Sequence, residues 1–220
     1  MKTLTLEALY TLQLMNDQSD ELSFLPSPLL SEGKTRKEQL KEILKKGYHD
    51  LEEIGLLKEN EPTDEFVRYG YYISLYAKNY YHFQVDSNYF CAPGVDQDKR
   101  MAVIIKRVGD NAYIIDYFNT IALLSILLEN HDVLHHLDDK KKNYLKSEWE
   151  PYAYMRLLAY YGDAKTIRLK VEQLGKIYSD RLFFNTKSGL FEYDMMEQAI
   201  RSVSVSEMKH SLISNMKVRA

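Results

Sequence analysis

Residues 101–118 read MAVIIKRVGDNAYIIDYF, and this stretch decides the fold class. Two runs rich in β-branched and aromatic residues flank Gly109-Asp110-Asn111, a combination typical of a tight turn between two strands. The pattern therefore predicts an antiparallel β-hairpin. A second hairpin is predicted over Asp180–Met195, around a turn at 185–189, and strict alternation over KTIRLKVEQL, residues 165–174, predicts a strand before it.

Helical signals dominate the chain before the first hairpin. Thr5, Thr35 and Thr63 each stand where an N-cap is expected, and Thr35 with Glu38 has the spacing of a capping box. Three helices are expected. The first follows Thr5 and runs through about Met15, and the third runs from Asp64 to about Lys78. The second runs from Thr35 to a left-handed cap at Gly55, with a break at Gly47. The alternating run at 80–93 then predicts two short strands.

The second half of the chain shows a similar order of elements. Asn119 is expected to cap a helix after the first hairpin, residues 149–161 are expected to be helical, and Ser204 with Glu207 predicts a capping box for a last helix. We therefore expect an α+β fold, with an antiparallel sheet built from two pseudo-repeated hairpin-helix halves and an N-terminal helical, winged-helix-like segment. One domain is expected over 1–220, comprising a helical segment (1–79), a first half (80–136) and a second half (137–220).

Composition limits the compartment. No apolar run approaches the length of a membrane span, and the first residues lack the features of a signal peptide. Cys91 is the only cysteine, which excludes an intramolecular disulfide and a cysteine-rich zinc site. These features predict a cytoplasmic protein without membrane insertion.

The stretch GLLKENEPTDEFVRYG, residues 55–70, has the form of a helix-turn-helix in a winged-helix DNA-binding module. The formal net charge of -3 argues against this function, because DNA affinity comes mainly from surplus Lys and Arg. In the most basic stretch, residues 34–46, Glu38 and Glu42 interrupt the lysines and are expected to pair with Lys45 or Lys46. No nucleic-acid partner is expected, and a winged-helix regulator is the least favoured alternative.

Residue types that carry chemistry are few. His131 and His135 have the spacing of a two-histidine metal site, with Asp132, Asp138 and Asp139 as further ligands, but a polar helix end accounts for them more simply. Cys91 lies inside an apolar run without a neighbouring base, and no nucleophile or phosphate-binding motif is present. The sequence predicts no catalytic residue, no metal and no cofactor, and hence no enzyme.

The order of elements resembles a known family. The chain contains, in order, Leu25-Pro26, a helix ending in EIGLLKENEPTDEF, a third helix, YYHFQVDSNYFCAPG, the hairpin at 101–118, KTIRLKVEQL and DRLFFNTKSGLFEYDM. This order looks like that of the EspG-type and EsaE-type chaperones of type VII secretion. The resemblance implies a cytosolic, non-enzymatic chaperone that holds a helical substrate of the WXG100 or LXG class before export, with the secretion ATPase as a further partner. An immunity protein that neutralises a toxin is the main alternative.

The composition also contains 18 tyrosines, which cluster at 67–83 and 150–162 and favour a partner surface. Within the hairpin, Tyr113, Ile115 and Tyr117 share one face, while Ala112, Ile114 and Phe118 share the other with Asp116. Both faces are largely apolar. We expect the face of Tyr113, Ile115 and Tyr117 to bind the partner, unless a helix of the same chain covers it.

Overall fold

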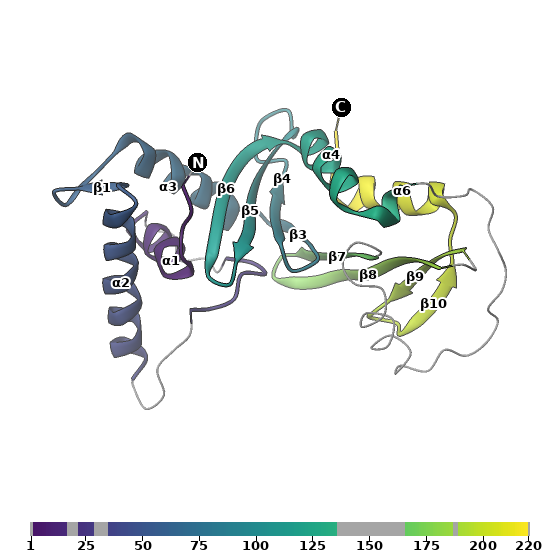
Figure 1. Cartoon of the computed structure of the whole chain (residues 1–220), viewed down its shortest axis with the longest axis horizontal. Coiled ribbons are helices and arrows are strands. Elements are labelled where there is room, and N and C mark those ends of the chain that lie inside the picture. Colours follow the sequence, from purple (N-terminus) through teal and green to yellow (C-terminus); the bar gives the residue numbers. More distant parts are fainter. Residues whose placement is uncertain (1, 17–21, 29–34, 136–165, 187–188, 220) are drawn as a thin grey trace.

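The computed structural model describes residues 2–16, 22–28, 35–135, 166–186 and 189–219. Its centre is an eight-stranded, entirely antiparallel sheet with the order β10-β9-β8-β7-β3-β4-β5-β6 (Figure 1). The α+β fold with a large antiparallel sheet, expected from the alternating stretches, is thereby confirmed.

The first four strands of this sheet form a meander that ends in a helix. Its elements are β3 (Tyr81–Val85), β4 (Tyr89–Pro93), β5 (Met101–Gly109), β6 (Ala112–Asn119), α4 (Thr120–Asn130) and the short 3-10 helix η1 (Asp132–Leu134). The side chain of Asn119 accepts a hydrogen bond from the Ala122 N–H, so the predicted cap of α4 is confirmed.

The other four strands form a second meander, also followed by a helix. Its elements are β7 (Thr166–Gln173), β8 (Lys176–Thr186), β9 (Gly189–Asp194), β10 (Ala199–Ser202) and α6 (Val205–Asn215). The two meanders meet where β3 pairs with β7 in antiparallel register, with Phe83 opposite Val171. That the halves are related as a pseudo-repeat remains an interpretation of the pattern, as does the division at 79 and 136.

The N-terminal segment contains three helices and a short two-stranded sheet: α1 (Leu6–Met15), α2 (Arg36–Glu53), β1 (Leu57–Lys58), β2 (Glu61–Pro62) and α3 (Asp64–Ala77). Thr5, Thr35 and Thr63 cap the three helices, and Thr35 forms the predicted capping box with Glu38. Gly55 has a φ of +68°, as expected for a left-handed cap. The break predicted at Gly47 is wrong, because α2 continues through it.

The two faces of the sheet carry separate apolar cores. On one face, α1 and α3 pack over β4, β5 and β6, and this core includes Leu12, Tyr76 and Ile105. On the opposite face, α4 and α6 pack over the centre of the sheet, where Phe83, Leu127 and Met208 are buried (Figure 1). Alternation along each strand therefore supplies apolar side chains to both faces, which accounts for the apolar composition of both sides of the hairpin.

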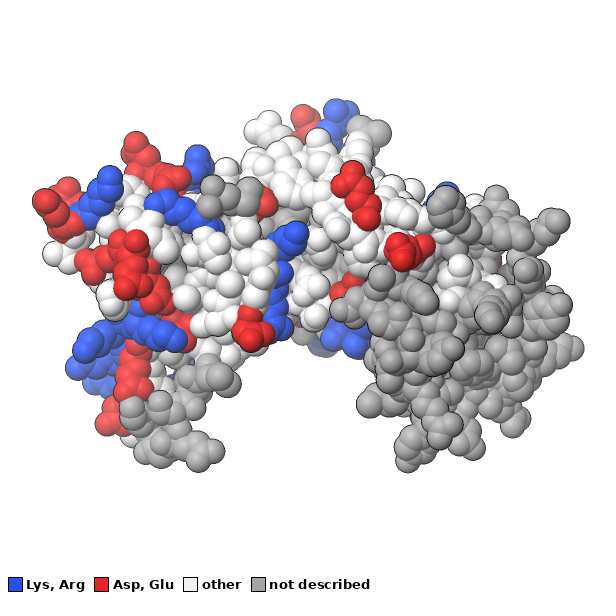
Figure 2. Space-filling view, in the orientation of Figure 1, with Lys and Arg blue, Asp and Glu red and all other residues white. Residues whose placement is uncertain are grey.

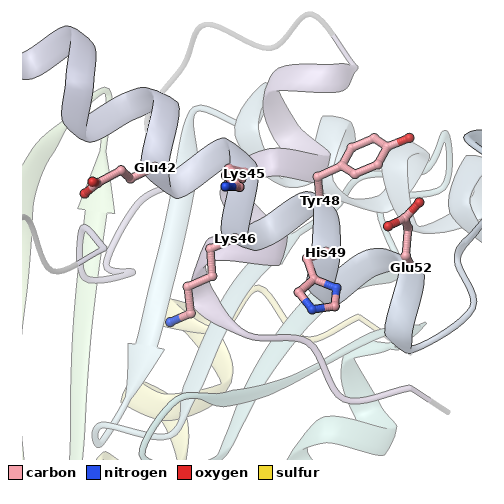
Figure 3. Close-up of a pocket in the computed structure, with 6 residues that line it drawn as sticks. All are labelled: Glu42, Lys45, Lys46, Tyr48, His49 and Glu52. Carbon is pink, nitrogen blue, oxygen red and sulfur yellow. The ribbon is translucent and has the colours of Figure 1, made fainter.

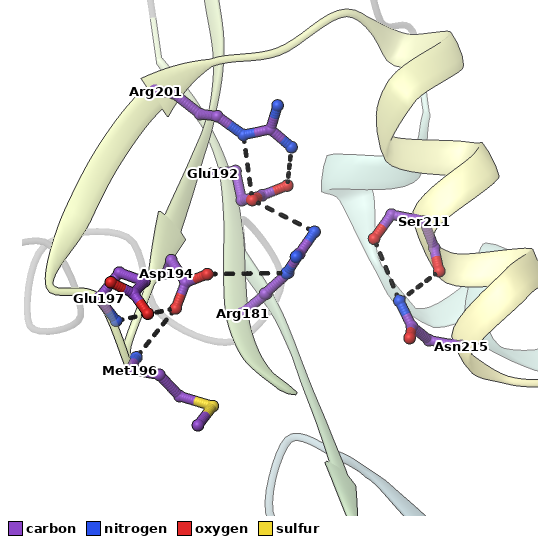
Figure 4. Close-up of polar contacts among 8 residues, drawn as sticks. All are labelled: Arg181, Glu192, Asp194, Met196, Glu197, Arg201, Ser211 and Asn215. Atoms are coloured by element: carbon purple, nitrogen blue, oxygen red, sulfur yellow. Dashed lines mark hydrogen bonds and ion pairs between the residues drawn. The ribbon is translucent and has the colours of Figure 1, made fainter. Parts of the chain in front are cut away.

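Two polar connections fix the ends of these strands. Asp86, in the β3–β4 turn, accepts a hydrogen bond from the Arg168 N–H of β7 at 2.8 Å and lies 2.7 Å from Nε2 of His131 at the end of α4. On the outer strands, the buried carboxylate of Glu192 accepts two hydrogen bonds from Arg201 and lies 3.5 Å from Arg181 (Figure 4). The charged groups inside this part of the fold are thus paired.

One predicted helix falls outside the described residues, and several short strands were not predicted. The helix expected at 149–161 lies outside the described residues. The strands β1, β2 and β10, and the start of β8 at Lys176, were not predicted from the sequence. None of the helices in the described ranges combines the length and apolar character that a bilayer crossing needs.

Candidate partner-binding groove

The face on which partner binding was expected is covered by helices of the same chain. Tyr113 and Ile115 are each 2% exposed and belong to the core under α1 and α3. Tyr117 is half-buried, and its ring stacks on Tyr72 of α3 with 5.2 Å between centroids. Burial raises the pKa of the Tyr117 hydroxyl. Because Tyr113 and Ile115 are core residues, the face of Tyr113, Ile115 and Tyr117 is covered by helices of the same chain, which is the case in which no partner was expected to bind there.

The helix-turn-helix stretch, residues 55–70, follows α2 and folds as the short β1–β2 hairpin and the first half of α3. Figure 2 shows acidic and basic side chains interleaved over this end of the visible face. A shallow depression of about 480 Å³ on α2 is lined by side chains of both charges (Figure 3): Glu42, Lys45, Lys46, Tyr48, His49 and Glu52. Lys46 pairs with Glu7 of α1, and the Glu38 carboxylate accepts hydrogen bonds from Thr35 in the capping box.

Of the histidines considered as metal ligands, His131 caps the C-terminal end of α4 and His135 follows η1. Nδ1 of His131 is 2.9 Å from the Leu127 carbonyl and Nε2 is 2.7 Å from Asp86, so both ring nitrogens face protein acceptors. His135 is exposed, and Asp138 and Asp139 lie outside the described residues. Within the described ranges, no group of three or more His, Cys, Asp or Glu side chains could hold a metal ion. Cys91 is fully buried, and burial raises its pKa.

The tyrosine cluster at 67–83 is divided between core and surface. Tyr69, Tyr76 and Tyr81 are buried, and burial raises the pKa of Tyr81 to about 12. Tyr71 and Tyr80 are exposed. The other cluster, at 150–162, lies outside the described residues. Tyr80 is therefore an exposed aromatic side chain on the surface just before β3.

A groove of about 680 Å³ opens beside this residue, along the β3–β7 junction, and we call it the β3–β7 groove. Residues of α1, α2, the segment 22–27, the start of β3 and the β7–β8 turn line it. Its rim carries four exposed apolar side chains: Leu14 (39%), Leu40 (44%), Tyr80 (62%) and Leu174 (74%). Exposed apolar residues that gather around one depression make this groove a candidate for binding another molecule.

Leu174 has an unusual backbone as well as an exposed side chain. It forms the two-residue turn between β7 and β8 with Gly175, and the φ angles are +51° and +72°. Positive φ at both positions defines a type I′ turn, in which Asn and Gly are favoured. A leucine there costs roughly 1 kcal/mol or more, because its Cβ crowds the backbone. Neither burial nor turn geometry accounts for leucine at this position.

Phe24 is a second large apolar residue with a positive φ, and it lines another side of the same groove. The Leu25 N–H donates to the Leu22 carbonyl, and Phe24 occupies the third position of that turn with a φ of +64°. Glycine is the residue usually required there. Phe24 and Leu174 are the apolar residues with left-handed φ in the described part of the chain, and both line the β3–β7 groove. Local strain thus coincides with an apolar surface.

The floor of the groove is polar. His82 and Glu172 face each other across the β3–β7 pairing, with 4.0 Å between His82 Nδ1 and the Glu172 carboxylate. Ser23 Oγ donates to Glu172 at 2.7 Å, and His82 Nε2 lies 2.8 Å from the Tyr76 carbonyl. Burial lowers the pKa of His82. The site therefore combines an apolar rim with a carboxylate beneath it.

The sequence contained only part of the signal for this site. The alternating run to Leu174, followed by Gly175, favours a tight turn, and Tyr80 belonged to a noted tyrosine cluster. Which of these residues are exposed depends on the β3–β7 pairing, which joins distant parts of the chain. A scan against protein-family models finds no match, and a search of curated proteins finds none either.

Proposed function

We propose that this protein is a cytoplasmic chaperone or adaptor that binds a helical type VII secretion substrate of the WXG100 or LXG class and keeps it competent for export. The observation that carries the proposal is Leu174, an exposed leucine in a backbone conformation that favours asparagine or glycine. A residue that is unfavourable for the turn and buries little surface is accounted for by contact with a partner.

The chemistry of the rim fits a helix as that partner. An amphipathic helix presents apolar residues at every third or fourth position, and such a stripe binds in grooves lined by apolar and aromatic side chains. Tyr80 and Leu174 supply large side chains that would become buried on binding, and aromatic anchors of this kind dominate the free energy of many interfaces. The resemblance in element order supports the same function and adds the secretion ATPase as a second candidate partner.

The direct test is co-expression with the products of neighbouring genes, followed by purification of the complex. Retention of a WXG100-type or LXG-type protein is the expected result. If only the catalytic domain of a toxin were retained, neutralisation of that toxin would replace the proposed function. The secretion ATPase is tested in the same way, with and without the substrate.

The variant Leu174→Asn separates binding from stability. Asparagine suits the left-handed position, so we expect the free energy of unfolding to be unchanged or to rise by about 1 kcal/mol. Affinity for the co-purified partner is expected to fall at least about tenfold, because an apolar anchor is lost. Denaturant unfolding and calorimetric titration measure the two quantities.

An exposure-matched pair of variants serves as the control. Tyr80→Ser, in the groove, is expected to weaken binding, whereas Tyr71→Ser on α3 is expected to leave it unchanged, although Tyr71 is 57% exposed against 62% for Tyr80. Equal effects of the two changes, or full binding by Leu174→Asn, would contradict the assignment of the groove.

A further inference from the structure

Among the described residues, the carboxylate of Glu172 on the floor of the β3–β7 groove has no lysine or arginine partner. Its side chain is 16% exposed, and its Oε1 atom accepts the hydrogen bond from Ser23 Oγ. His82 is the nearest ionisable group, but burial lowers its pKa and favours the neutral ring. Within the described residues, Oε2 of Glu172 has no hydrogen-bond or ion-pair partner.

The neighbouring cations do not neutralise this carboxylate. Lys170 points from the same face of β7, but its ammonium lies 4.0 Å from Asp180 and 6.0 Å from the centre of the Phe24 ring. Arg36 and Lys78 also line the groove, are exposed, and form no ion pair with Glu172 in the described part of the chain. A negative charge is therefore held in a partly desolvated position, which is unfavourable until a positive charge approaches.

We propose that the groove receives a lysine side chain of the helical partner, whose ammonium pairs with Oε2 of Glu172. The lysine stem and the flanking apolar residues of that helix would then contact Tyr80, Leu40 and Leu174, since a long aliphatic stem packs on apolar surface while its charge reaches a polar group. Lysine suits the site because its ammonium is a compact charge on a flexible stem and needs only one oxygen, Oε2, while Oε1 keeps its hydrogen bond from Ser23. This inference rests on the proposed function and specifies the partner's chemistry.

The first test uses the free protein. Glu172→Gln keeps the shape of the side chain and an acceptor for Ser23 but removes the charge. If the carboxylate is held for a partner, its removal relieves the desolvation of an unpaired charge, and we expect the midpoint of thermal unfolding to rise. A lower midpoint would show that the fold itself compensates the charge, and would overturn the inference. Glu61→Gln, at an exposed position of β2, is the matched control and should leave the midpoint unchanged.

The second test measures binding with defined probes. A helical peptide of about five turns with one apolar stripe and a central lysine is compared with the same peptide carrying glutamine or glutamate. The lysine peptide is expected to bind the wild type at least about tenfold more tightly than the glutamine peptide, with the glutamate peptide weakest, and this preference should vanish in Glu172→Gln. Equal binding of the lysine and glutamine peptides would overturn the inference.

The same two variants distinguish this inference from the proposed function. If Leu174→Asn loses the co-purified partner but Glu172→Gln retains it at full affinity, the groove binds its partner without the charge pair, and only the inference fails. If neither variant changes the affinity for that partner, the groove itself is not the binding surface, and both fail. Loss of affinity in both variants supports both.

Discussion

At the scale of single residues, the β3–β7 groove combines two kinds of unfavourable placement. Leu174 and Phe24 hold large apolar side chains on backbone positions that suit smaller residues, and Glu172 holds a charge where water is partly excluded. The left-handed backbone of each apolar residue reduces the stability of the isolated protein by an amount on the order of 1 kcal/mol. Their coincidence around one depression is the reason for proposing this surface as the binding site, since burial of Leu174 and pairing of Glu172 by a partner would offset these costs.

His82 predicts a dependence of stability on pH. Burial holds its folded-state pKa below the ordinary value of 6.5, so the unfolded chain takes up a proton before the folded chain does. The contribution of the neutral His82 ring to the free energy of unfolding is therefore complete above pH 6.5. This contribution is lost as the pH falls from 6.5 toward the lower folded-state pKa, by at most about 1.4 kcal/mol per pH unit.

Glutamine in place of His82 can still donate to the Tyr76 carbonyl but does not titrate. We expect His82→Gln to lose less free energy of unfolding than the wild type between pH 7.5 and 5.5, as measured by urea unfolding at each pH. His210→Gln, at an exposed position of α6, is the control and should follow the wild type. Parallel curves for the wild type and His82→Gln would contradict this explanation.

At the scale of elements, Gly47 determines how closely α1 and α2 approach. A Cβ atom built at Gly47 would lie 2.2 Å from the Glu7 carbonyl oxygen and 2.2 Å from Thr11 Oγ1. Alanine normally stabilises a helix interior by about 1 kcal/mol relative to glycine, but here it would force the two helices apart. The glycine taken as a break in the helical pattern is thus a contact point between helices.

We expect Gly47→Ala to destabilise the protein by about 1–3 kcal/mol, because the cost of overpacking exceeds the gain in helix propensity. Chemical denaturation measures the change. Lys45→Ala, at an exposed position of the same helix, should change stability by no more than about 0.5 kcal/mol. A stabilised Gly47→Ala variant would mean that α1 and α2 can separate without loss.

The local elements were largely readable from the sequence because their signals are local. The caps at Thr5, Thr35 and Thr63 each depend on a hydrogen bond that spans three residues, and the turn at 109–111 follows from adjacent residue types. The short strands β1 and β2 were missed, because two residues per strand give no measurable alternation. The groove was missed because its residues meet only after the sheet has formed.

At the scale of the whole molecule, the sheet buries both of its faces, and this could not be predicted from the hairpin alone. Alternation showed that Tyr113 and Ile115 face away from Ile114 and Phe118. It did not show that α1 and α3 cover the first pair, because those helices come from elsewhere in the chain and reach the sheet by tertiary packing. Periodicity assigns residues to faces, whereas long-range packing decides which faces meet water.

The antiparallel pairing of β3 with β7 also has a consequence for the rate of folding. All other neighbours in the eight-stranded sheet follow one another in the chain, but this pairing closes a loop of roughly 90 residues and is entropically the most expensive. We expect Val171→Ala, which weakens this junction, to slow refolding in stopped-flow experiments. Leu123→Ala, on the buried side of α4, should act mainly by accelerating unfolding. The two sides of the β3–β7 groove would then come together only in the slow step, when this long-range pairing forms.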